Sequence, residues 1–294
     1  MQPEFSWTRR RVLAALAAVP VASLAGAADG DIELKRTGGP YVPTPQVVVD
    51  EMLRIGRVGP NDFVVDLGSG DGVIVLTAAV KHKARGFGVD IDPELVKLSN
   101  NEAKKRGVAE RAAFHVQDVF KADISKATVV TLYLLPNMML DLRPKIINEL
   151  RPGTRVVSHD YHFGDWQPDE QYTWDVPEKE KVNGVPRATV YLWIVPARVA
   201  GRWQLQLGAP ANERLDLALK QNFQNLSGTA TVGNARPVNL TQSRLLGEDI
   251  SFAFPSGGDR HLFKGRIADD TMEGTVQLAG GKGEARWSAS RVGR

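Results

Sequence analysis

Three glycines, each separated by one residue, stand among carboxylates in one short segment: Asp66-Leu67-Gly68-Ser69-Gly70-Asp71-Gly72. Glycine has no Cβ, so it allows a sharp turn and a close approach of the main chain to a ligand. An apolar run at residues 63–67 precedes the glycines, and a helical pattern at 71–81 follows them. Free N–H groups at a helix start attract carboxylates and phosphates. The segment predicts a ligand site at a strand-to-helix turn, although its spacing differs from the G-x-G-x-x-G of dinucleotide sites.

Two further carboxylates follow the next two predicted strands. Asp90 ends the run 86–90, and Asp118 follows the run 113–117. The carboxyl ends of consecutive parallel strands line the crevice in which doubly wound sheets bind ligands. There, a second-strand acid can accept hydrogen bonds from both hydroxyls of a ribose, and a third-strand acid can reach the exocyclic amine of a purine. The loop and its acids together predict a ligand that contains a nucleoside.

Short apolar runs alternate with helical patterns between about Tyr41 and Pro196. The predicted strands are 63–67, 86–90, 113–117, 128–134 and 154–159, and the predicted helices are 45–55, 71–81, 93–106 and 136–150. This alternation predicts an α/β domain with a Rossmann-like, doubly wound parallel sheet. Two later runs, 171–176 and 188–195, show no helix between them, which predicts an antiparallel hairpin at the sheet edge.

A different pattern begins after Pro196. Apolar and polar residues alternate, and glycine turns recur, as at 232–234 and 279–281. This predicts a small antiparallel barrel or sandwich of about seven or eight strands over residues 198–294. Its aromatic residues are predicted to form its core: Trp203, Phe223, Phe252, Phe254 and Trp287. A ligand-binding barrel and a docking module for an envelope partner are the alternatives for its role.

The N-terminus reads as a targeting signal. Arg9 and Arg10 precede an apolar run from Val12 to Ala27 that ends in a small-residue cleavage site. These features predict a twin-arginine signal peptide over residues 1–27 and a linker over 28–40. The mature chain is then exported to the periplasm or to an envelope membrane surface, and a cytoplasmic location is disfavoured. The apolar run is too short for a spanning helix, so no stable transmembrane segment is predicted in the mature chain.

The composition excludes several kinds of chemistry. The 294 residues include no cysteine, which rules out disulfides, thiolate nucleophiles and zinc–thiolate sites. The net charge of +3 is small, and the predicted signal carries most of it. That surplus is too weak to indicate nucleic-acid binding.

The loop and the three acids resemble the class I S-adenosylmethionine-dependent methyltransferases, over roughly residues 40–195. The resemblance implies S-adenosyl-L-methionine as the cofactor. It also implies that Asp66 and the loop glycines Gly68, Gly70 and Gly72 hold the methionine moiety.

The same resemblance places the adenosyl group against the next two strand ends. It implies that Asp90 binds the ribose and that Ile91 packs on the adenine. Asp118 would accept a hydrogen bond from the adenine amine, with Val119 beside it. Residues 133–136 lack the Asn/Asp-Pro-Pro-Tyr pattern of amide and base N-methyltransferases, which disfavours those subclasses.

Further segments are similar to the lysine methyltransferase family that acts on the c subunit of ATP synthase: Pro40-Tyr41-Val42-Pro43-Thr44, Pro136-Asn137-Met138-Met139 and Trp166-Gln167-Pro168-Asp169. In that family the first of these segments lies near the cofactor, so Thr44 is a candidate cofactor contact. The resemblance implies methylation of a protein lysine. The segment 158–163 matches poorly, and the β-domain has no counterpart in the family.

The ends of the fourth and fifth strands offer the candidate catalytic residues Tyr133, Asp160 and Tyr161. A lysine acceptor must lose a proton, which a carboxylate could assist. Tyr41, Tyr161 and Trp166 could wall a channel whose π faces accommodate a cation. His159, Asp160 and His162 resemble a fragment of a metal site, but an extended backbone would divide them between two faces, so no metal is predicted.

Three hypotheses follow for the function. The first is an S-adenosylmethionine-dependent methyltransferase with a protein substrate, most simply a lysine. The alternative is an exported, non-catalytic protein that binds S-adenosylmethionine or acts as a scaffold, because an exported enzyme would need its own supply of a cytoplasmic cofactor. A nicotinamide dehydrogenase is disfavoured by the glycine spacing and by Asp118.

Overall fold

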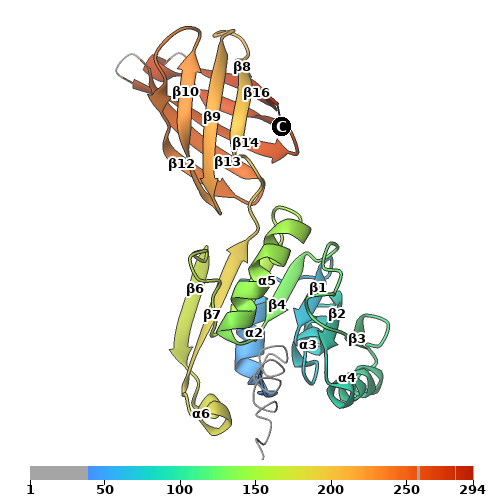
Figure 1. The fold of residues 1–294 in the computed structure, drawn as a ribbon. Coiled ribbons are helices and arrows are strands. Elements are labelled where there is room, and N and C mark those ends of the chain that lie inside the picture. The colour runs from blue at the N-terminus through green and yellow to red at the C-terminus, as the bar shows by residue number, and fades with distance from the viewer. Residues whose placement is uncertain (1–38, 257–258, 282, 294) are drawn as a thin grey trace, which may run out of the picture.

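The computed structural model describes residues 39–256, 259–281 and 283–293, which form two sheets with separate cores (Figure 1). The predicted signal peptide and most of the predicted linker lie outside the described residues. One sheet belongs to an α/β domain that ends with a strand at Ile194, and the other begins at Gly201.

The first sheet has seven strands in the order β3-β2-β1-β4-β5-β7-β6. Its parallel strands are β1 (Phe63–Leu67), β2 (Arg85–Asp90), β3 (Ala112–Val116), β4 (Val129–Leu132) and β5 (Arg155–His159). The edge pair is β6 (Glu170–Asp175) and β7 (Arg187–Ile194), which are antiparallel to each other. The doubly wound sheet and its antiparallel edge are therefore confirmed. The expectation of no helix between the edge strands is wrong, because α6 (Pro177–Asn183) connects them.

Helices cover both faces of this sheet. They are α2 (Gln46–Ile55), α3 (Val73–Lys81), α4 (Pro93–Lys105) and α5 (Pro136–Glu149). Successive strand residues point to opposite faces. Accordingly, Val64 packs in one core with α2 and α3, whereas Val65 packs in another with α5. Burial on both faces explains why these strands are continuous apolar runs.

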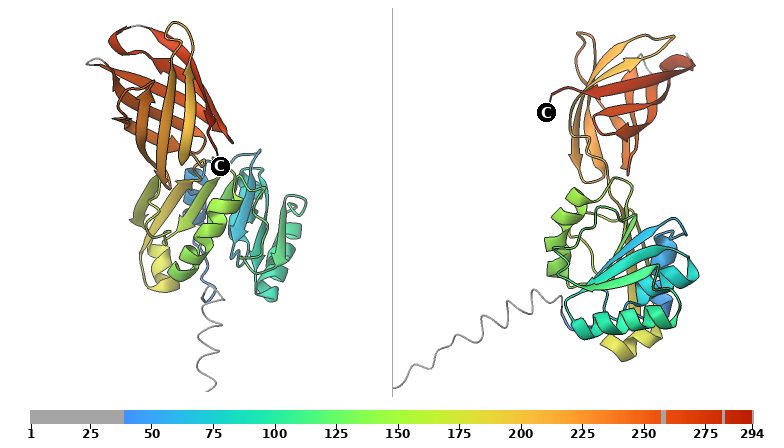
Figure 2. Two further views of the ribbon diagram at one scale, coloured as in Figure 1. Left: turned by 45° about the horizontal axis from the view of Figure 1, so that its top comes forward. Right: turned by 90° about the vertical axis from the view of Figure 1, so that its right-hand side faces the viewer.

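The strand order reverses between β1 and β4, and the glycine loop follows the carboxyl end of β1. In open α/β sheets, ligands bind at such a switch point, outside the carboxyl ends of the strands. The second domain stands at the opposite end, where the parallel strands begin (Figures 1 and 2). The fold thus leaves the carboxyl-end crevice facing away from the second domain.

The second domain is a nearly closed antiparallel barrel. Its strands are β8 (Gly201–Leu207), β9 (Arg214–Asn222), β10 (Asn225–Val232), β11 (Val238–Asn239), β12 (Thr241–Leu246), β13 (Asp249–Ser256), β14 (Asp259–Ala268), β15 (Thr271–Gln277) and β16 (Glu284–Arg291). They form one sheet in the order β11-β10-β9-β8-β16-β15-β14-β13-β12. The prediction of about seven or eight strands is low by at least one, and the shortest of the nine described strands, β11, has only two residues.

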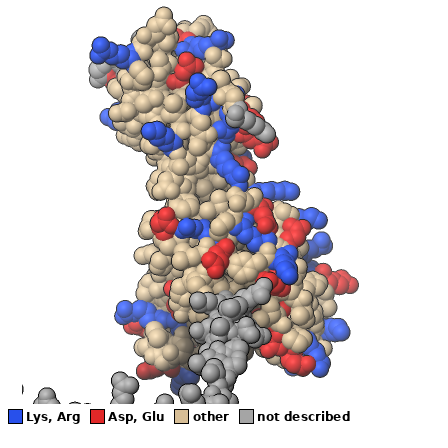
Figure 3. Space-filling view, viewed as in Figure 1, with Lys and Arg blue, Asp and Glu red and all other residues tan. Residues whose placement is uncertain are grey.

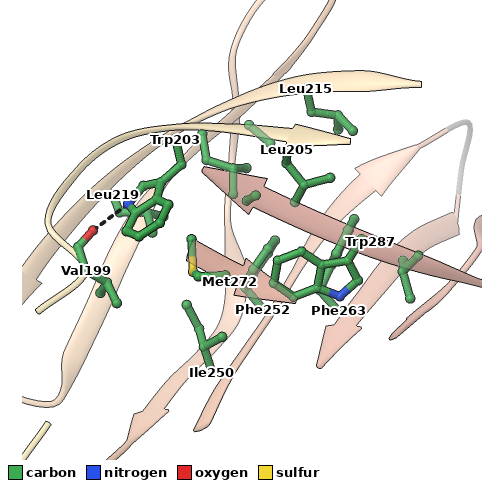
Figure 4. Close-up of a cluster of buried hydrophobic side chains, with 14 of the residues drawn as sticks. Val199, Trp203, Leu205, Leu215, Leu219, Ile250, Phe252, Phe263, Met272 and Trp287 are labelled. Carbon is green, nitrogen blue, oxygen red and sulfur yellow. Dashed lines mark hydrogen bonds between the residues drawn. The ribbon is translucent and has the colours of Figure 1, made fainter. Parts of the chain in front are cut away.

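Large side chains from both walls fill the barrel interior (Figure 4). Phe252 stacks on Phe263 with centroids 4.7 Å apart, and Trp287 contacts both rings edge-on. Trp203 is fully buried, and its indole N–H donates to the carbonyl of Val199 at 2.9 Å. The filled interior gives no support to the ligand-binding barrel. Four of the five predicted core aromatics belong to this cluster, and the fifth, Phe223, packs against the α/β domain instead.

Candidate functional site

The glycine loop between β1 and α3 has the backbone that its sequence predicts. Gly68, Gly70 and Gly72 all have positive φ angles, +81°, +52° and +77°. L-residues with a side chain rarely adopt this conformation. A Cβ on Gly70 would also lie 2.6 Å from the ring of Tyr41, and Gly72 directly precedes the first turn of α3. The loop is therefore held tightly against its neighbours while its main chain faces the crevice.

Two carboxylates hold the loop and the strand beneath it. Asp90 accepts hydrogen bonds from the N–H of Gly70 at 2.8 Å and of Asp92 at 3.0 Å. Asp66 is buried and accepts from the hydroxyl of Thr131 at 2.7 Å. Burial, together with the negative charges of Asp90 and Asp71, raises the pKa of Asp66 to about 7 despite the hydrogen bond from Thr131. A cationic ligand beside Asp66 would reverse that shift.

These groups surround a cavity of about 430 Å³ at the carboxyl ends of the strands. Its described lining contains five carboxylates, Asp66, Asp71, Asp90, Asp92 and Asp118, and three tyrosines, Tyr41, Tyr133 and Tyr161. The same lining includes no lysine, arginine or histidine. Apolar walls come from residues such as Ile91, Val119, Leu134 and Met138. An apolar cleft with carboxylates on its walls fits a nucleoside that carries positive charge.

The structure brings most of the predicted cofactor residues to this cavity. They are Thr44, Asp66, Gly68, Gly70, Asp90, Ile91, Asp118 and Val119. Gly72 is outside the described lining and caps α3 instead. The hydroxyl of Ser69 is buried in the loop without a hydrogen-bond partner among the described residues, which fits a place for a polar ligand group. The individual roles of these residues stay predictions.

The predicted catalytic residues separate into two groups. Tyr133 and Tyr161 line the cavity with rings stacked 6.1 Å apart. Burial and the nearby charge of Asp160 raise the pKa of Tyr133 to about 12, so its phenol stays protonated near neutral pH. Asp160 lies outside the described lining and forms an ion pair with Lys179 of α6.

The ring of His159 lies under Tyr133, with centroids 4.0 Å apart. Burial lowers the pKa of His159 to about 4, and its ring is neutral near pH 7. Its 3.4 Å approach to Asp160 is therefore a contact and not an ion pair. The described residues contain no cluster of histidine, aspartate and glutamate that could hold a metal ion.

One predicted channel residue is misplaced, and two residues at the site were missed. Trp166 is fully buried beneath the sheet face and cannot wall a channel. Asn183, at the end of α6, reaches the hydroxyl of Tyr133 at 3.4 Å. Asp71 is the second missed residue: together with burial, its charge raises the pKa of the Tyr41 phenol. No sequence pattern marked Asn183, because its position depends on the missed helix, whereas Asp71 stands inside the glycine motif and could have been assigned from it.

The comparisons with known proteins agree with this geometry. A family model described as the ANTKMT methyltransferase domain matches residues 66–170. A protein-lysine N-methyltransferase from Saccharolobus islandicus is 42% identical over 157 residues, covering 53% of this chain and 93% of that protein. This chain belongs to the family of S-adenosylmethionine-dependent methyltransferases that includes this relative. Its cofactor is S-adenosylmethionine, and it is a methyltransferase enzyme.

Other relatives also match about half of this chain. The lysine N-methyltransferase of the ATP synthase c subunit from Xenopus laevis is 36% identical over 44% of this chain and 57% of its own length. A crystal structure of an RNA methyltransferase from Salinibacter ruber, in complex with S-adenosyl-L-homocysteine, is 49% identical with a TM-score of 0.48, and the match covers 54% of this chain and 96% of that one. Each of these matches covers little more than half of this chain or less, so much of it has no counterpart in them.

The glycine loop gives a direct test of the cavity. Gly70→Ala is expected to weaken S-adenosylhomocysteine binding by at least tenfold, because a Cβ would meet the ring of Tyr41 and strain the left-handed backbone. Calorimetry measures this loss. Gly107→Ala is the matched control, because Gly107 has a positive φ of 67° with open space around its Cβ position. Equal affinity in the Gly70 and Gly107 variants would contradict the placement of the cofactor at the loop.

Proposed function

We propose that this methyltransferase transfers its methyl group to the side-chain amine of a protein lysine. The observation that carries the proposal is the charge of the cavity, whose described lining offers five carboxylates and no basic side chain. On the face shown in Figure 3, basic and acidic residues are interspersed over the exterior of the α/β domain. The described lining of the cavity, in contrast, carries only negative charge, which would attract an ammonium group and repel a phosphate backbone.

The methyl group passes directly from the cofactor to the acceptor, so the protein forms no covalent bond to either. The cofactor supplies the methyl group on a positively charged sulfur. The neutral amine of lysine forms a bond to the methyl carbon as the bond from carbon to sulfur breaks, and the proton leaves to water. Tyr133 and Tyr161 present stacked rings to the cavity, and their π faces stabilise an alkylammonium before and after transfer. Positioning and exclusion of water supply the rate enhancement.

The names of the relatives support lysine as the acceptor. A protein-lysine N-methyltransferase and an enzyme named for the c subunit of ATP synthase match 53% and 44% of this chain. A non-catalytic scaffold, the alternative drawn from sequence, gains no support from these matches. Turnover with any acceptor excludes it.

The acceptor is identified by its product. We expect labelled methyl from S-adenosylmethionine to enter the protein fraction of a cell extract and to appear as methylated lysine after acid hydrolysis. Purified total RNA is the competing substrate in a parallel reaction, and Asp90→Ala, which is expected to weaken cofactor binding, is the control. Label in RNA, or in another amino acid, would overturn the proposal.

We also propose that the chain is exported through a twin-arginine signal. The support is the pair Arg9 and Arg10 followed by the apolar run to Ala27. Within the described residues, no helix combines the length and the apolar character needed to cross a membrane. Export of an already folded protein would allow bound cofactor to travel with it.

Changing both arginines to lysine, R9K/R10K, is expected to stop export, because the paired guanidinium groups are what such a signal presents. Fractionation of cells that express the full chain measures the result. In the wild type, N-terminal sequencing of the exported form should begin at Ala28. An unchanged distribution in the double variant would remove the twin-arginine assignment.

A further inference from the structure

The turn between β9 and β10 carries an aromatic residue in an unfavourable backbone conformation. Phe223 has φ +53°, which is uncommon for any residue with a side chain and an outlier for a bulky one. Asparagine or glycine would occupy this position at lower cost. The ring of Phe223 lies outside the barrel core and stacks on Trp166 of the α/β domain, with centroids 5.7 Å apart and planes at 15°. A bulky residue in a strained backbone conformation is tolerated where its side chain is needed, so the contact with Trp166 points to a role for the ring.

Hydrogen bonds of Gln221 and Gln224 and a cation–π contact of Arg143 fix this turn against the connection between domains and against the α/β domain. Gln221 donates to the carbonyls of Ala197 and Phe223 and accepts from the N–H of Val199, which ties the turn to the connection between domains. Gln224 donates to the carbonyl of Gln167 at 2.6 Å. The guanidinium of Arg143 lies 5.4 Å from the centroid of the Phe223 ring. This turn is one of the places where the barrel touches the α/β domain, and another is the β12–β13 turn, where Gly247 lies against Gly153 and Ile194.

The segment that contacts the Phe223 ring also contributes a residue to the cavity lining. Residues 160–169 connect β5 with β6 and carry Tyr161 at the cavity and Trp166 at the barrel. Phe163 lies between them and stacks on Trp166, with centroids 5.5 Å apart. Arg143 donates to the carbonyl of Phe163 at 2.8 Å, so the residue that covers the Phe223 ring also holds this segment.

We infer that the barrel positions the acceptor side of the active site, with Phe223 as the positioning residue that holds residues 160–169 and hence Tyr161. Trp166 is fully buried, and the ring of Phe223 from the barrel covers one of its faces. The cofactor loop and its carboxylates are held by separate contacts within β1, β2 and β4. The barrel thus acts on the acceptor side and leaves the cofactor side unchanged.

Phe223→Gly tests this inference in the full-length protein. Glycine relieves the backbone strain but removes the ring, so a turn with only a local role would be stabilised. We instead expect Phe223→Gly to destabilise residues 160–169, where amide hydrogen exchange should become about tenfold faster. The affinity for S-adenosylhomocysteine should stay within about twofold, because the cofactor-side contacts are intact.

Methyl transfer to poly-L-lysine supplies the second readout. In Phe223→Gly, kcat should fall about fivefold or more while KM for S-adenosylmethionine is unchanged, because a misplaced acceptor wall lowers only the transfer step. Phe223→Tyr keeps the ring and should restore both exchange and kcat. Gln224→Ala removes only the bond to the Gln167 carbonyl and should give a smaller acceleration of exchange.

Asn212→Gly is the matched control, since Asn212 has a similar φ of +51° in the turn between β8 and β9, at the other end of β9. It should alter neither exchange in 160–169 nor kcat. Unchanged exchange in Phe223→Gly, or equal effects in both glycine variants, would overturn the inference. Hydrogen exchange needs no acceptor, so this result is independent of whether lysine is the natural substrate.

Discussion

Asp160→Asn is expected to lower the free energy of unfolding by about 3–5 kcal/mol, because it leaves Lys179 charged and unpaired in the interior. The side chain of Lys179 is 2% exposed and that of Asp160 is 18% exposed. The carboxylate of Asp160 accepts from the Lys179 ammonium and from the N–H of Thr189 at 3.0 Å. Asparagine cannot supply the charge that the ammonium requires. Urea unfolding followed by circular dichroism measures the loss.

The choice of asparagine removes a competing explanation. Asp160 has φ +61°, a conformation that asparagine tolerates better than most residues with a side chain. The backbone cost of the substitution is therefore small. A loss of several kcal/mol must then come from the buried charge, and not from strain at the end of β5.

A double variant separates a structural from a catalytic role for Asp160. Replacing both partners of a buried ion pair by uncharged groups costs much less than removing one of them. D160N/K179M should therefore recover most of the stability and most of the methyl transfer to poly-L-lysine. If the double variant folds, binds S-adenosylhomocysteine and fails to transfer, Asp160 takes part in the reaction as its sequence position predicted.

The fold and the cofactor side were predictable because their signals are local. The parallel strands are buried on both faces, so each appears as an apolar run between helical patterns, and the predicted run 63–67 matches β1 at both ends. The glycine loop needs positive φ angles at Gly68, Gly70 and Gly72, and glycine is the residue that adopts them freely. A short motif therefore determines both the backbone and the place of the ligand.

The acceptor side was not predictable because its geometry depends on contacts between distant segments. Trp166 is near Tyr161 in sequence but is turned into the core, where its carbonyl accepts from the indole N–H of Trp193 at 2.9 Å. Lys179 follows a proline at the start of α6 and shows no pattern that announces a buried ion pair with Asp160.

Phe223 shows the same limit between domains. It stands in an alternating apolar pattern that is typical of a barrel core, yet it belongs to a turn. Its contact with Trp166 joins residues that only the assembled structure brings together. Sequence patterns report which side chains are buried, and the partner of each buried side chain depends on the tertiary arrangement.

The affinity for S-adenosylhomocysteine is expected to rise with pH between about 5 and 7 and then to level off, since a buried carboxylate must ionise to meet the positive methionine amine. Burial raises the pKa of Asp66 to about 7, and the charges of Asp90 and Asp71 add to that effect. In the free protein this carboxyl is protonated below pH 7. A cation beside it favours the charged form, so binding releases a proton in that range.

Calorimetry in buffers of different ionisation enthalpy measures the released proton. At pH 6 the release should approach one proton per cofactor, and the affinity should rise by up to about tenfold per pH unit. Above about pH 8 the affinity should fall again, because an α-amino group loses its own proton there. Asp66→Asn should abolish the rise of affinity with pH. Asp118→Asn, in the same cavity lining, should lower the affinity at every pH but retain its rise with pH. A rise that survives in Asp66→Asn would assign the titrating group elsewhere.

The raised pKa of Asp66 also affects stability: as pH rises, the affinity for the cofactor increases while the free energy of unfolding decreases. A carboxyl whose pKa is higher in the folded than in the unfolded state stabilises the fold at low pH, and that contribution is lost as pH rises from about 4 to about 7. Each unit of difference corresponds to about 1.4 kcal/mol. Asp66→Asn should therefore unfold at a higher temperature than the wild type at pH 8 and at a similar temperature near pH 4. A variant that is more stable and yet binds cofactor poorly would show that Asp66 is kept buried for its ligand at the expense of the fold.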